Sequence, residues 1–146
     1  MFRRITKDDR ALYLSLAREF YASPAVLHGV PEDYLQRTFD EAVRSDTYAE
    51  IYILGEGGGY ALLAKSFSQE AGGPVVWLDE FYVREEARGQ GLGKEFLRFL
   101  TERYGKTARL RLETEPENVR AEKLYRSHGF ALLPYKQFVR EAEEQK

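Results

Sequence analysis

A glycine-rich stretch, RGQGLGK at residues 88–94, constrains this chain more than any other part of its sequence. Glycine loses more conformational entropy on folding than other residues, so three glycines within five residues indicate that a bare backbone is needed there. The stretch follows a β-branched, aromatic run at 75–83 and precedes apolar residues at helical spacing, which predicts strand, loop and helix in that order. Free N–H groups and the positive end of a helix dipole favour an anion at such a loop, most often a phosphate.

Two common phosphate-binding motifs do not fit these residues. A P-loop aligned on the Gly-Lys pair at 93–94 would place Arg88 where a glycine is required and Glu95 where a hydroxyl is required. A dinucleotide-binding fingerprint beginning at residue 89 meets Lys94 where its third glycine should stand. An enzyme of nucleoside triphosphates is therefore the least favoured interpretation of the loop.

The composition excludes several classes of function. The 146 residues fit one domain, 1–146, which is long enough to bury a core without covalent cross-links. The chain has no cysteine, so it has neither disulfides nor thiolate sites, and we expect a cytoplasmic location. The 22 Lys and Arg residues nearly balance 24 Asp and Glu, which argues against a nucleic-acid partner. No apolar run approaches the length of a membrane span, so no membrane partner is expected.

Hydrophobic periodicity and turn residues predict the order βααβββαβαββ. The expected strands are 2–6, 49–56, 60–67, 75–83 and 108–113, with one or two more across 130–135 and 136–141. The expected helices are 7–22, 31–45, 92–104 and 118–128. Glycine-rich turns at 55–59 and 70–73 predict antiparallel hairpins, whereas the crossover between residues 75 and 113 predicts a parallel pair. The fold class is therefore α/β (α+β), a single mixed, mostly antiparallel sheet with helices on both faces.

Two motifs, together with this order of elements, resemble the GNAT superfamily of acyl-CoA-dependent N-acyltransferases. The glycine loop meets the family's R-x-x-G-x-G pattern with Arg88, Gly91 and Gly93. The second motif is met in ENVRAEKLYRSHGF by Asn118, Tyr125, Gly129 and Phe130. The resemblance covers nearly the whole chain. Within the family, the chain resembles enzymes that act on small amines, such as the spermidine/spermine N-acetyltransferases. It implies a six- to seven-stranded sheet whose fourth and fifth strands splay apart.

The resemblance implies acetyl-CoA as co-substrate and no metal. In this family the loop binds the pyrophosphate of coenzyme A, and the pantetheine arm pairs with the fourth strand as an added strand. Arg88 is expected either to shape the loop or to reach a phosphate. The residues implied at the cofactor site are Phe81, Tyr82, Val83, Arg88, Gly89, Gln90, Gly91, Leu92, Gly93, Lys94, Asn118 and Ala121.

Three residues are candidates for the chemistry. An alkyl amine is mostly protonated at neutral pH, so a carboxylate must hold the ammonium group and accept its proton. Asp79 and Glu80 stand at the expected fork, and an acidic pair occupies this place in the resembling enzymes. Adjacent strand residues face opposite sides, so normally only one of the two can point into a given cleft. We favour Glu80 as base and Asp79 as amine binder, with the reverse assignment open. Tyr125 matches the family's tyrosine that protonates the leaving thiolate.

The acceptor is less well defined than the cofactor. In the family, the loop between the first two helices and the start of the fifth strand build its pocket, and the residues taken from these regions are His28, Tyr34 and Glu113. Together with the acidic pair they predict a cleft for a small cationic amine. Tyrosines elsewhere are interpreted as core or pocket wall: Tyr21, Tyr48, Tyr52, Tyr60 and Tyr82.

Two alternative functions stay open at this stage. The acceptor is a protein or peptide amine in the first, and the chain is a non-catalytic acyl-CoA-binding sensor in the second. Retention of both Tyr125 and the acidic pair favours an enzyme over a sensor. Many members of the family dimerise, so the resemblance also implies a possible homodimer, although no segment of the sequence marks an interface.

Overall fold

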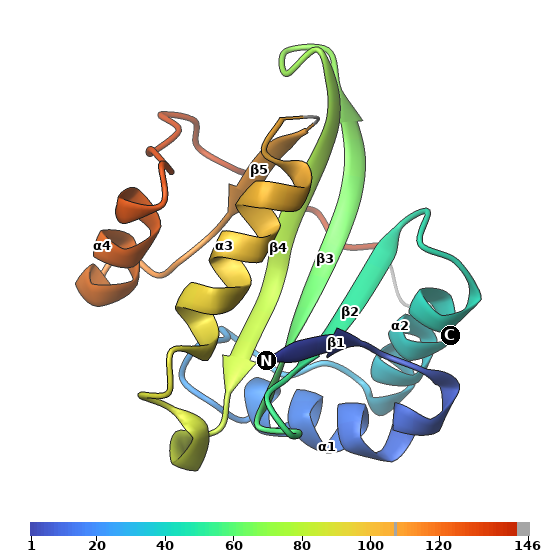
Figure 1. Cartoon of the computed structure of the whole chain (residues 1–146). Helices are drawn as coiled ribbons and strands as arrows, with labels where there is room; N and C mark the ends of the chain where they lie inside the picture. The colour runs from blue at the N-terminus through green and yellow to red at the C-terminus, as the bar shows by residue number, and fades with distance from the viewer. Residues whose placement is uncertain (107, 143–146) are drawn as a thin grey trace.

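The computed structural model describes residues 1–106 and 108–142, which form one five-stranded sheet covered by helices on both faces (Figure 1). In spatial order the strands are β1 Phe2–Arg4, β2 Ala49–Leu54, β3 Gly59–Ser68, β4 Gly73–Val83 and β5 Arg109–Leu112. The α-helices are α1 Arg10–Tyr21, α2 Glu32–Arg44, α3 Leu92–Tyr104 and α4 Val119–Ser127, and 3-10 turns lie at Lys7–Asp9 and Glu85–Ala87. β1 to β4 pair antiparallel in succession, and β5 pairs with β4 in parallel, as the turn and crossover signals predict.

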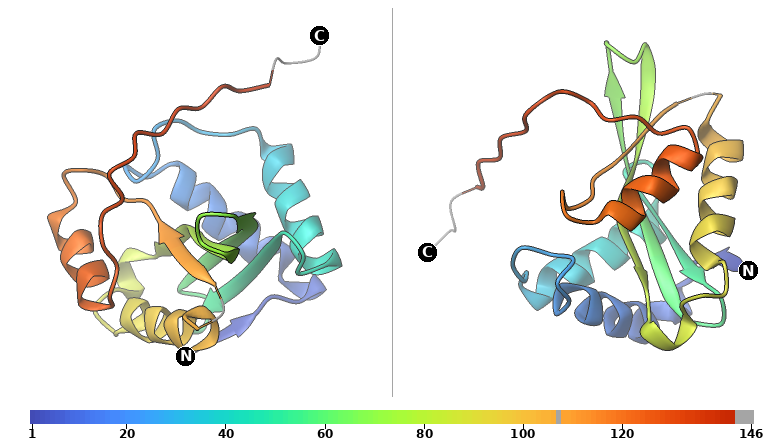
Figure 2. Two further views of the ribbon diagram at one scale, coloured as in Figure 1. Left: turned by 90° about the horizontal axis from the view of Figure 1, so that it is seen from above. Right: turned by 90° about the vertical axis from the view of Figure 1, so that its left-hand side faces the viewer.

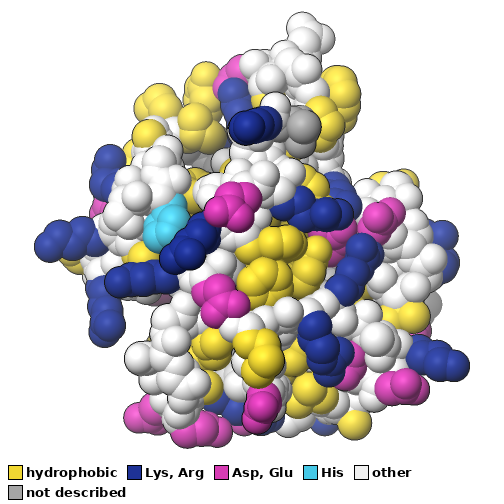
Figure 3. Space-filling view, in the orientation of Figure 1, with side chains coloured by type: hydrophobic (Ala, Val, Ile, Leu, Met, Phe, Trp, Pro, Cys, Tyr) yellow, Lys and Arg dark blue, Asp and Glu magenta, His cyan; other side chains and the backbone are white. Residues whose placement is uncertain are grey.

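The sheet separates two hydrophobic clusters. Helices α1 and α2 cover one face, and α3 and α4 lie on the other (Figure 2). Alternation along β2 divides its side chains between the clusters, with Ile51 and Ile53 toward α1 and Tyr52 and Leu54 toward α3. Acidic and basic side chains are interspersed over the surface shown in Figure 3. Within the described residues, no helix has both the length and the apolar character that crossing a membrane requires.

The centre of β4 contains an irregularity that shapes the rest of the sheet. Leu62 of β3 lies opposite Glu80, but the next residue, Leu63, lies opposite Leu78. Asp79 is therefore an extra residue on β4, which is a β-bulge. The parallel pairing with β5 covers only Val75 to Leu78, so the two strands part just before the bulge. This confirms the expected splaying of the fourth and fifth strands.

The first helix begins later than its periodicity predicts. Residues expected to open it form the 3-10 turn Lys7–Asp9 instead. The Asp9 carboxylate accepts hydrogen bonds from the Thr6 N–H and from the Arg3 guanidinium, all at 2.8 Å. The bonds from Arg3 contribute most to lowering the pKa of Asp9 to about 2. This reciprocal cap fixes the turn, and α1 follows it.

The prediction of strands after α4 is wrong. Residues 130–142 contain neither strand nor helix, so the sheet has five strands rather than six or seven and ends at β5. Gly129 ends α4 with a left-handed φ of 89°, as expected. The residues after it run as an extended C-terminal arm, 131–142, whose side chains are all exposed. Pro134 lacks a backbone N–H, and an extended segment without a paired neighbour has no ladder of hydrogen bonds to define it as a strand.

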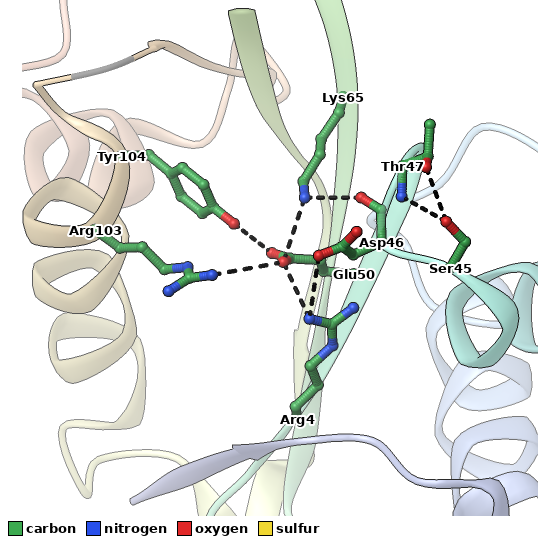
Figure 4. A network of polar contacts seen from close by, with 8 residues as sticks. All are labelled: Arg4, Ser45, Asp46, Thr47, Glu50, Lys65, Arg103 and Tyr104. Carbon is green, nitrogen blue, oxygen red and sulfur yellow. Dashed lines mark hydrogen bonds and ion pairs between the residues drawn. The ribbon is translucent and has the colours of Figure 1, made fainter.

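A buried carboxylate joins the sheet to α3. Glu50 on β2 is fully buried, and its Oε2 accepts a 2.7 Å hydrogen bond from the Tyr104 hydroxyl (Figure 4). Its Oε1 lies 3.3 Å from both Arg4 Nη1 and Lys65 Nζ, and 4.0 Å from Arg103 Nη2. These partners come from β1, β3 and α3, so one charge links four elements. A buried carboxylate is tolerated only with such compensation.

We predict that Glu50→Gln lowers the free energy of unfolding by about 2 kcal/mol, because the amide loses the charge and turns an N–H₂ group toward donors. Urea denaturation at pH 7 measures this loss. The matched control is Glu41→Gln, whose carboxylate pairs with Arg44 on the surface. The control is expected to change stability by less than about 0.5 kcal/mol. Equal losses in the two variants would contradict a special role for the buried charge.

Candidate active site

The glycine loop has the backbone geometry of an anion site. Gly91 caps α3 in a left-handed conformation with φ of 79°, and Gly89 has φ of 80°. The backbone N–H groups of residues 89–94 make no hydrogen bond to any other described residue. They therefore remain free to bind a ligand at the positive end of the α3 dipole. In this respect the loop has the form that its sequence predicts.

Neighbouring side chains hold the loop against β4. Arg88 Nε donates a 2.9 Å hydrogen bond to the carbonyl oxygen of Val83, the last residue of β4. Of its two expected roles, this contact corresponds to shaping the loop. A methyl group added at Gly93 would meet the Phe81 ring at an ordinary 3.5 Å, so its backbone does not require glycine there. Leu92 is buried and anchors the helix, whereas Gln90 and Lys94 are exposed beside the free N–H groups.

The acidic pair lies at the bulge, where β4 leaves β5. Two tyrosine hydroxyls donate to Glu80: Tyr60 to Oε1 at 2.7 Å, and Tyr21, the last residue of α1, to Oε2. Burial has the largest effect on the pKa of Glu80 and raises it above its ordinary value. The two hydrogen bonds lower this pKa by a smaller amount, and the charge of Asp79 raises it further. The carboxyl group is therefore both oriented and easier to protonate than a surface glutamate.

The bulge removes the strict alternation of side chains at this point of the strand. Burial, the hydrogen bond to Glu80 and the charges of both carboxylates raise the pKa of Tyr21. Asp79 thus acts electrostatically on the same tyrosine that binds its neighbour. An extra residue in one strand permits this, because two consecutive residues then oppose a single partner.

Asp79 also lies near the end of β5. It lines a hollow of about 370 Å³ together with Trp77 and Glu113. Loss of water around Asp79, and next the charge of Glu113, raise the pKa of Asp79. The Arg111 guanidinium stacks over the Trp77 ring with its Cζ 4.2 Å from the centroid. Lys65 also lines this hollow, but its ammonium group lies 3.3 Å from the buried Glu50 carboxylate and donates to the Asp46 carbonyl. With that cation paired, the carboxylates of Asp79 and Glu113 make the hollow suited to positive charge.

Tyr125 and Asn118 lie on the second predicted motif. Asn118 Oδ1 accepts a 3.1 Å hydrogen bond from the Ala121 N–H, which is the expected helix cap. Tyr125 packs against the α3-side cluster that also contacts Phe81 and Leu112, one from each splayed strand. Burial raises the pKa of its hydroxyl, which makes no hydrogen bond to the other described residues. A phenol that keeps its proton is available as a donor.

The structure does not bring His28 and Tyr34 to this hollow. Both side chains are exposed, and neither is among its lining residues. The Tyr34 ring lies instead under the Arg37 guanidinium, with 5.1 Å from Cζ to the centroid. Only Glu113 of the three expected acceptor residues lies close to the acidic pair.

Sequence reasoning missed the roles of Tyr21 and Tyr60. It interpreted them as core or pocket wall, and Tyr60 is indeed fully buried. No local pattern links residues 21 and 60 to residue 80, because their meeting depends on how α1 lies over β3 and β4. The signal available was only that a buried tyrosine hydroxyl usually finds a partner.

A metal centre receives no support from the described residues, among which no three His, Cys, Asp or Glu side chains gather to hold an ion. The geometry of the site instead combines three features. A glycine loop presents free N–H groups, the β5-facing edge of β4 is open beyond Leu78, and a carboxylate pair lies where the edge opens. Together they suit a long ligand with an anionic end, an extended middle and a reacting end beside the carboxylates.

Comparisons with known proteins agree with this geometry. The model of the acetyltransferase (GNAT) family matches residues 11–130. The chain is 28% identical over 138 residues to the spermine/spermidine N(1)-acetyltransferase of Bacillus subtilis strain 168, covering 88% of this chain and 85% of the relative.

Solved structures show the same fold. An integron cassette protein from a salt-marsh metagenome superposes with a TM-score of 0.80 at 26% identity, covering 99% of this chain and 91% of that one. The aminoglycoside acetyltransferase AAC(6')-Iy, solved with a CoA-containing bisubstrate analogue, gives a TM-score of 0.75 at 22% identity, covering 97% of each chain. The match of the family model over most of the chain is decisive: this protein belongs to the acetyltransferase (GNAT) family and is an acyltransferase.

Proposed function

We propose that this protein is an acetyl-CoA-dependent N-acetyltransferase that transfers the acetyl group directly to a primary amine of a small cationic acceptor. The observation that carries the proposal is the position of Asp79 and Glu80, at the bulge where β4 parts from β5. There a thioester lying along β4 and an amine held by carboxylates can meet.

The residues around the loop fit coenzyme A. The free N–H groups of residues 89–94 would hold the pyrophosphate, and the exposed Lys94 adds a positive charge beside them. The edge of β4 at Phe81, Tyr82 and Val83 would pair with the amide groups of the pantetheine arm, beside the hydrogen bond that the Val83 carbonyl already accepts from Arg88. Asn118 and Ala121, at the start of α4, would contact the same arm from the other side of the splay. A backbone N–H of β4 would stabilise the oxyanion that develops on the thioester carbonyl.

The chemistry requires two proton transfers. Glu80 would accept a proton from the incoming ammonium, directly or through a water, while Asp79 holds the positive charge. The free amine then attacks the thioester carbonyl, so that a C–N bond forms and the C–S bond breaks. Tyr125 would donate its proton to the departing thiolate, because a phenol near pKa 10 can protonate a sulfur as its charge builds. No covalent intermediate on the protein is needed.

A cationic acceptor is favoured by the surroundings of the acidic pair. Asp79, Glu113 and Trp77 line one hollow, which offers two negative charges and an aromatic wall, while Lys65, which also lines it, is paired with the buried Glu50. The names of the similar proteins, a spermine/spermidine acetyltransferase and an aminoglycoside acetyltransferase, support the same chemical class. His28 and Tyr34 stay predictions as acceptor contacts, since neither lies in the hollow.

The direct test follows thiol release from acetyl-CoA in the presence of pooled amines: polyamines, aminoglycosides, amino acids and short peptides. We expect turnover with the polyamine or aminoglycoside pool. Turnover with peptides alone would replace the small acceptor with a protein or peptide amine. A sensor would be favoured by two results together. Acetyl-CoA would bind tightly without turnover in any pool, and Tyr125→Phe would leave that binding unchanged.

We predict that Tyr125→Phe lowers kcat by about 100-fold and leaves the affinity for acetyl-CoA nearly unchanged, because only the donated proton is lost. Steady-state kinetics and calorimetric titration measure the two quantities. Tyr48→Phe, which changes an exposed tyrosine, is the matched control and should keep the full rate. An unchanged kcat in Tyr125→Phe would remove this residue from the mechanism.

We predict that Gly91→Ala weakens coenzyme A binding by about tenfold, since a left-handed φ strains an alanine by about 1–2 kcal/mol and turns the loop N–H groups. Calorimetric titration with coenzyme A measures the change. Gly72→Ala is the control, because Gly72 has a similar φ of 76° and equally open space around its Cα but lies in the turn between β3 and β4. The control should bind as the wild type does; equal weakening in both would exclude a specific role for the loop.

The pH dependence of kcat should report Glu80. A base works when deprotonated, so kcat should rise with pH through a pKa that burial holds above the ordinary glutamate value. The hydrogen bond from Tyr21 lowers that pKa, so Tyr21→Phe should move the rising limb to higher pH. Tyr48→Phe should leave the limb in place. Two results would contradict this assignment: a shift of the rising limb to lower pH in Tyr21→Phe, or a rising limb that persists in both Glu80→Gln and Asp79→Asn.

A further inference from the structure

Trp77 and Arg111 form a cross-strand pair beside the hollow of about 370 Å³, the acceptor hollow, which Trp77 lines. They lie directly opposite each other in the parallel pairing of β4 with β5, and the Arg111 Cζ is 4.2 Å from the centroid of the indole ring. The side chains before and after them on both strands belong to the cluster next to α3: Val76, Leu78, Leu110 and Leu112. Alternation therefore turns the pair toward the opposite face of the sheet, on which α1 and α2 lie (Figure 2).

Arg111 differs from the other cations near the acceptor hollow, because its guanidinium has no anionic partner in the described part of the chain. Arg109, two residues earlier on the same strand, has its Nη1 3.0 Å from a carboxylate oxygen of Glu70. Lys65 has its Nζ 3.3 Å from the buried Glu50 carboxylate. The indole ring thus holds the Arg111 guanidinium in place without cancelling its charge.

The opposite charge lies at the other end of the hollow. Asp79 and Glu113 follow Trp77 and Arg111 by two residues along the chain, and both line the hollow. The two carboxylates are close enough to interact, since the charge of Glu113 contributes to raising the pKa of Asp79. A strand rises about 3.3 Å per residue, so the carboxylates and the guanidinium lie about 7 Å apart along the sheet. The charge around the hollow therefore changes sign within the length of a small acceptor.

This change of sign acts on any acceptor that carries two positive charges. When the acidic pair at the bulge holds the reacting amine, the rest of the acceptor extends along the hollow. A second ammonium close to the first stays between Asp79 and Glu113, which attract it. A second ammonium farther away reaches the Trp77 ring, where it meets the Arg111 guanidinium, and the two cations repel each other.

We propose that Arg111 is a specificity-determining residue: it occupies the cation-binding face of Trp77 and so selects acceptors whose second ammonium lies close to the reacting amine. The favoured class is a short diamine, or a longer polyamine whose terminal nitrogens are closely spaced. This inference rests on the proposed function, from which it takes the position of the reacting amine. It adds that a cation of the protein itself, rather than the size of the hollow, limits the spacing of the charges.

The first test measures binding without turnover. Trp77 is the single tryptophan of the chain, so the intrinsic fluorescence reports on this ring alone. Linear diamines from ethylenediamine to octamethylenediamine are titrated into the protein with coenzyme A present. Wild type should bind the short diamines more tightly than the long ones. Arg111→Gln should bind the long diamines about tenfold more tightly than wild type does, because an ammonium can then take the vacant ring face.

The matched control is Arg109→Gln, which removes the same charge from the same strand two residues away. Arg109 is already paired with Glu70, so its loss should leave the preference for short diamines unchanged. Circular dichroism checks that both variants remain folded. An equal gain in the two variants would show that net charge alone sets the preference, and would overturn the proposal.

The second test asks whether the ring is the position for which the two cations compete. In the double variant Arg111→Gln, Trp77→Leu the tighter binding of long diamines should be lost again, because leucine has no aromatic face for a cation. Calorimetric titration with the same diamines measures this, since the double variant has no tryptophan. A gain that persists without the ring would overturn the proposal.

Steady-state kinetics with the same diamines separate this inference from the proposed function. Both predict acetyl transfer, with kcat/KM that falls as the diamine lengthens in wild type and falls less in Arg111→Gln. Binding that follows the expected order without any turnover would overturn the proposed function and leave the role of Arg111 in binding supported. Acetyl transfer with the same length preference in wild type and Arg111→Gln would overturn this inference alone. A wild type that prefers long diamines, or binds none of them, would overturn it as well.

Discussion

The β-bulge at Asp79 is the constraint on which the rest of the site depends. One extra residue on β4 shifts the pairing with β3, and the parallel pairing with β5 stops immediately before it. The same irregularity therefore opens the edge along which an extended ligand can lie and presents two acidic side chains at the opening. Bulges recur next to active sites because they redirect side chains without disturbing the remainder of a sheet. Here both hydrophobic clusters stay continuous on either side of it.

The two faces of the sheet contribute different parts of the site. The α3 side supplies the glycine loop, the packing of Tyr125 and the buried Glu50 network that ties α3 to three strands. The α1 side supplies Tyr21 and Tyr60, which hold Glu80. A ligand that lies in the gap between β4 and β5 therefore touches groups whose positions are set by two separate cores.

Much of the fold could be predicted from the sequence, because local signals determine it. Hairpin glycines, helical periodicity and the Asn118 cap predicted the order of elements through α4. The glycine loop was recognised by its closely spaced glycines, of which Gly89 and Gly91 adopt positive φ angles. The prediction of further strands after α4 was wrong, because Pro134 and the lack of a paired neighbour outweigh the apolar pattern of the arm. The bulge was equally invisible: it arises from register between strands, which no single segment encodes. The tyrosines that bind Glu80 were missed for the same reason, as they meet only through tertiary packing.

Tyr21 is the last residue of α1, and the 22–31 segment begins directly after it. Its hydroxyl is bound to Glu80, so the position of this helix end and the protonation of Glu80 are thermodynamically linked. A molecule that moves the end of α1 toward β4 would strengthen the hydrogen bond from Tyr21 and so favour the ionised form of Glu80. By reciprocity, a proton on Glu80 would weaken this hydrogen bond, which holds the end of the helix. The segment between the first two helices is thus coupled to the proton affinity of a group 59 residues further along the chain, through a single hydroxyl.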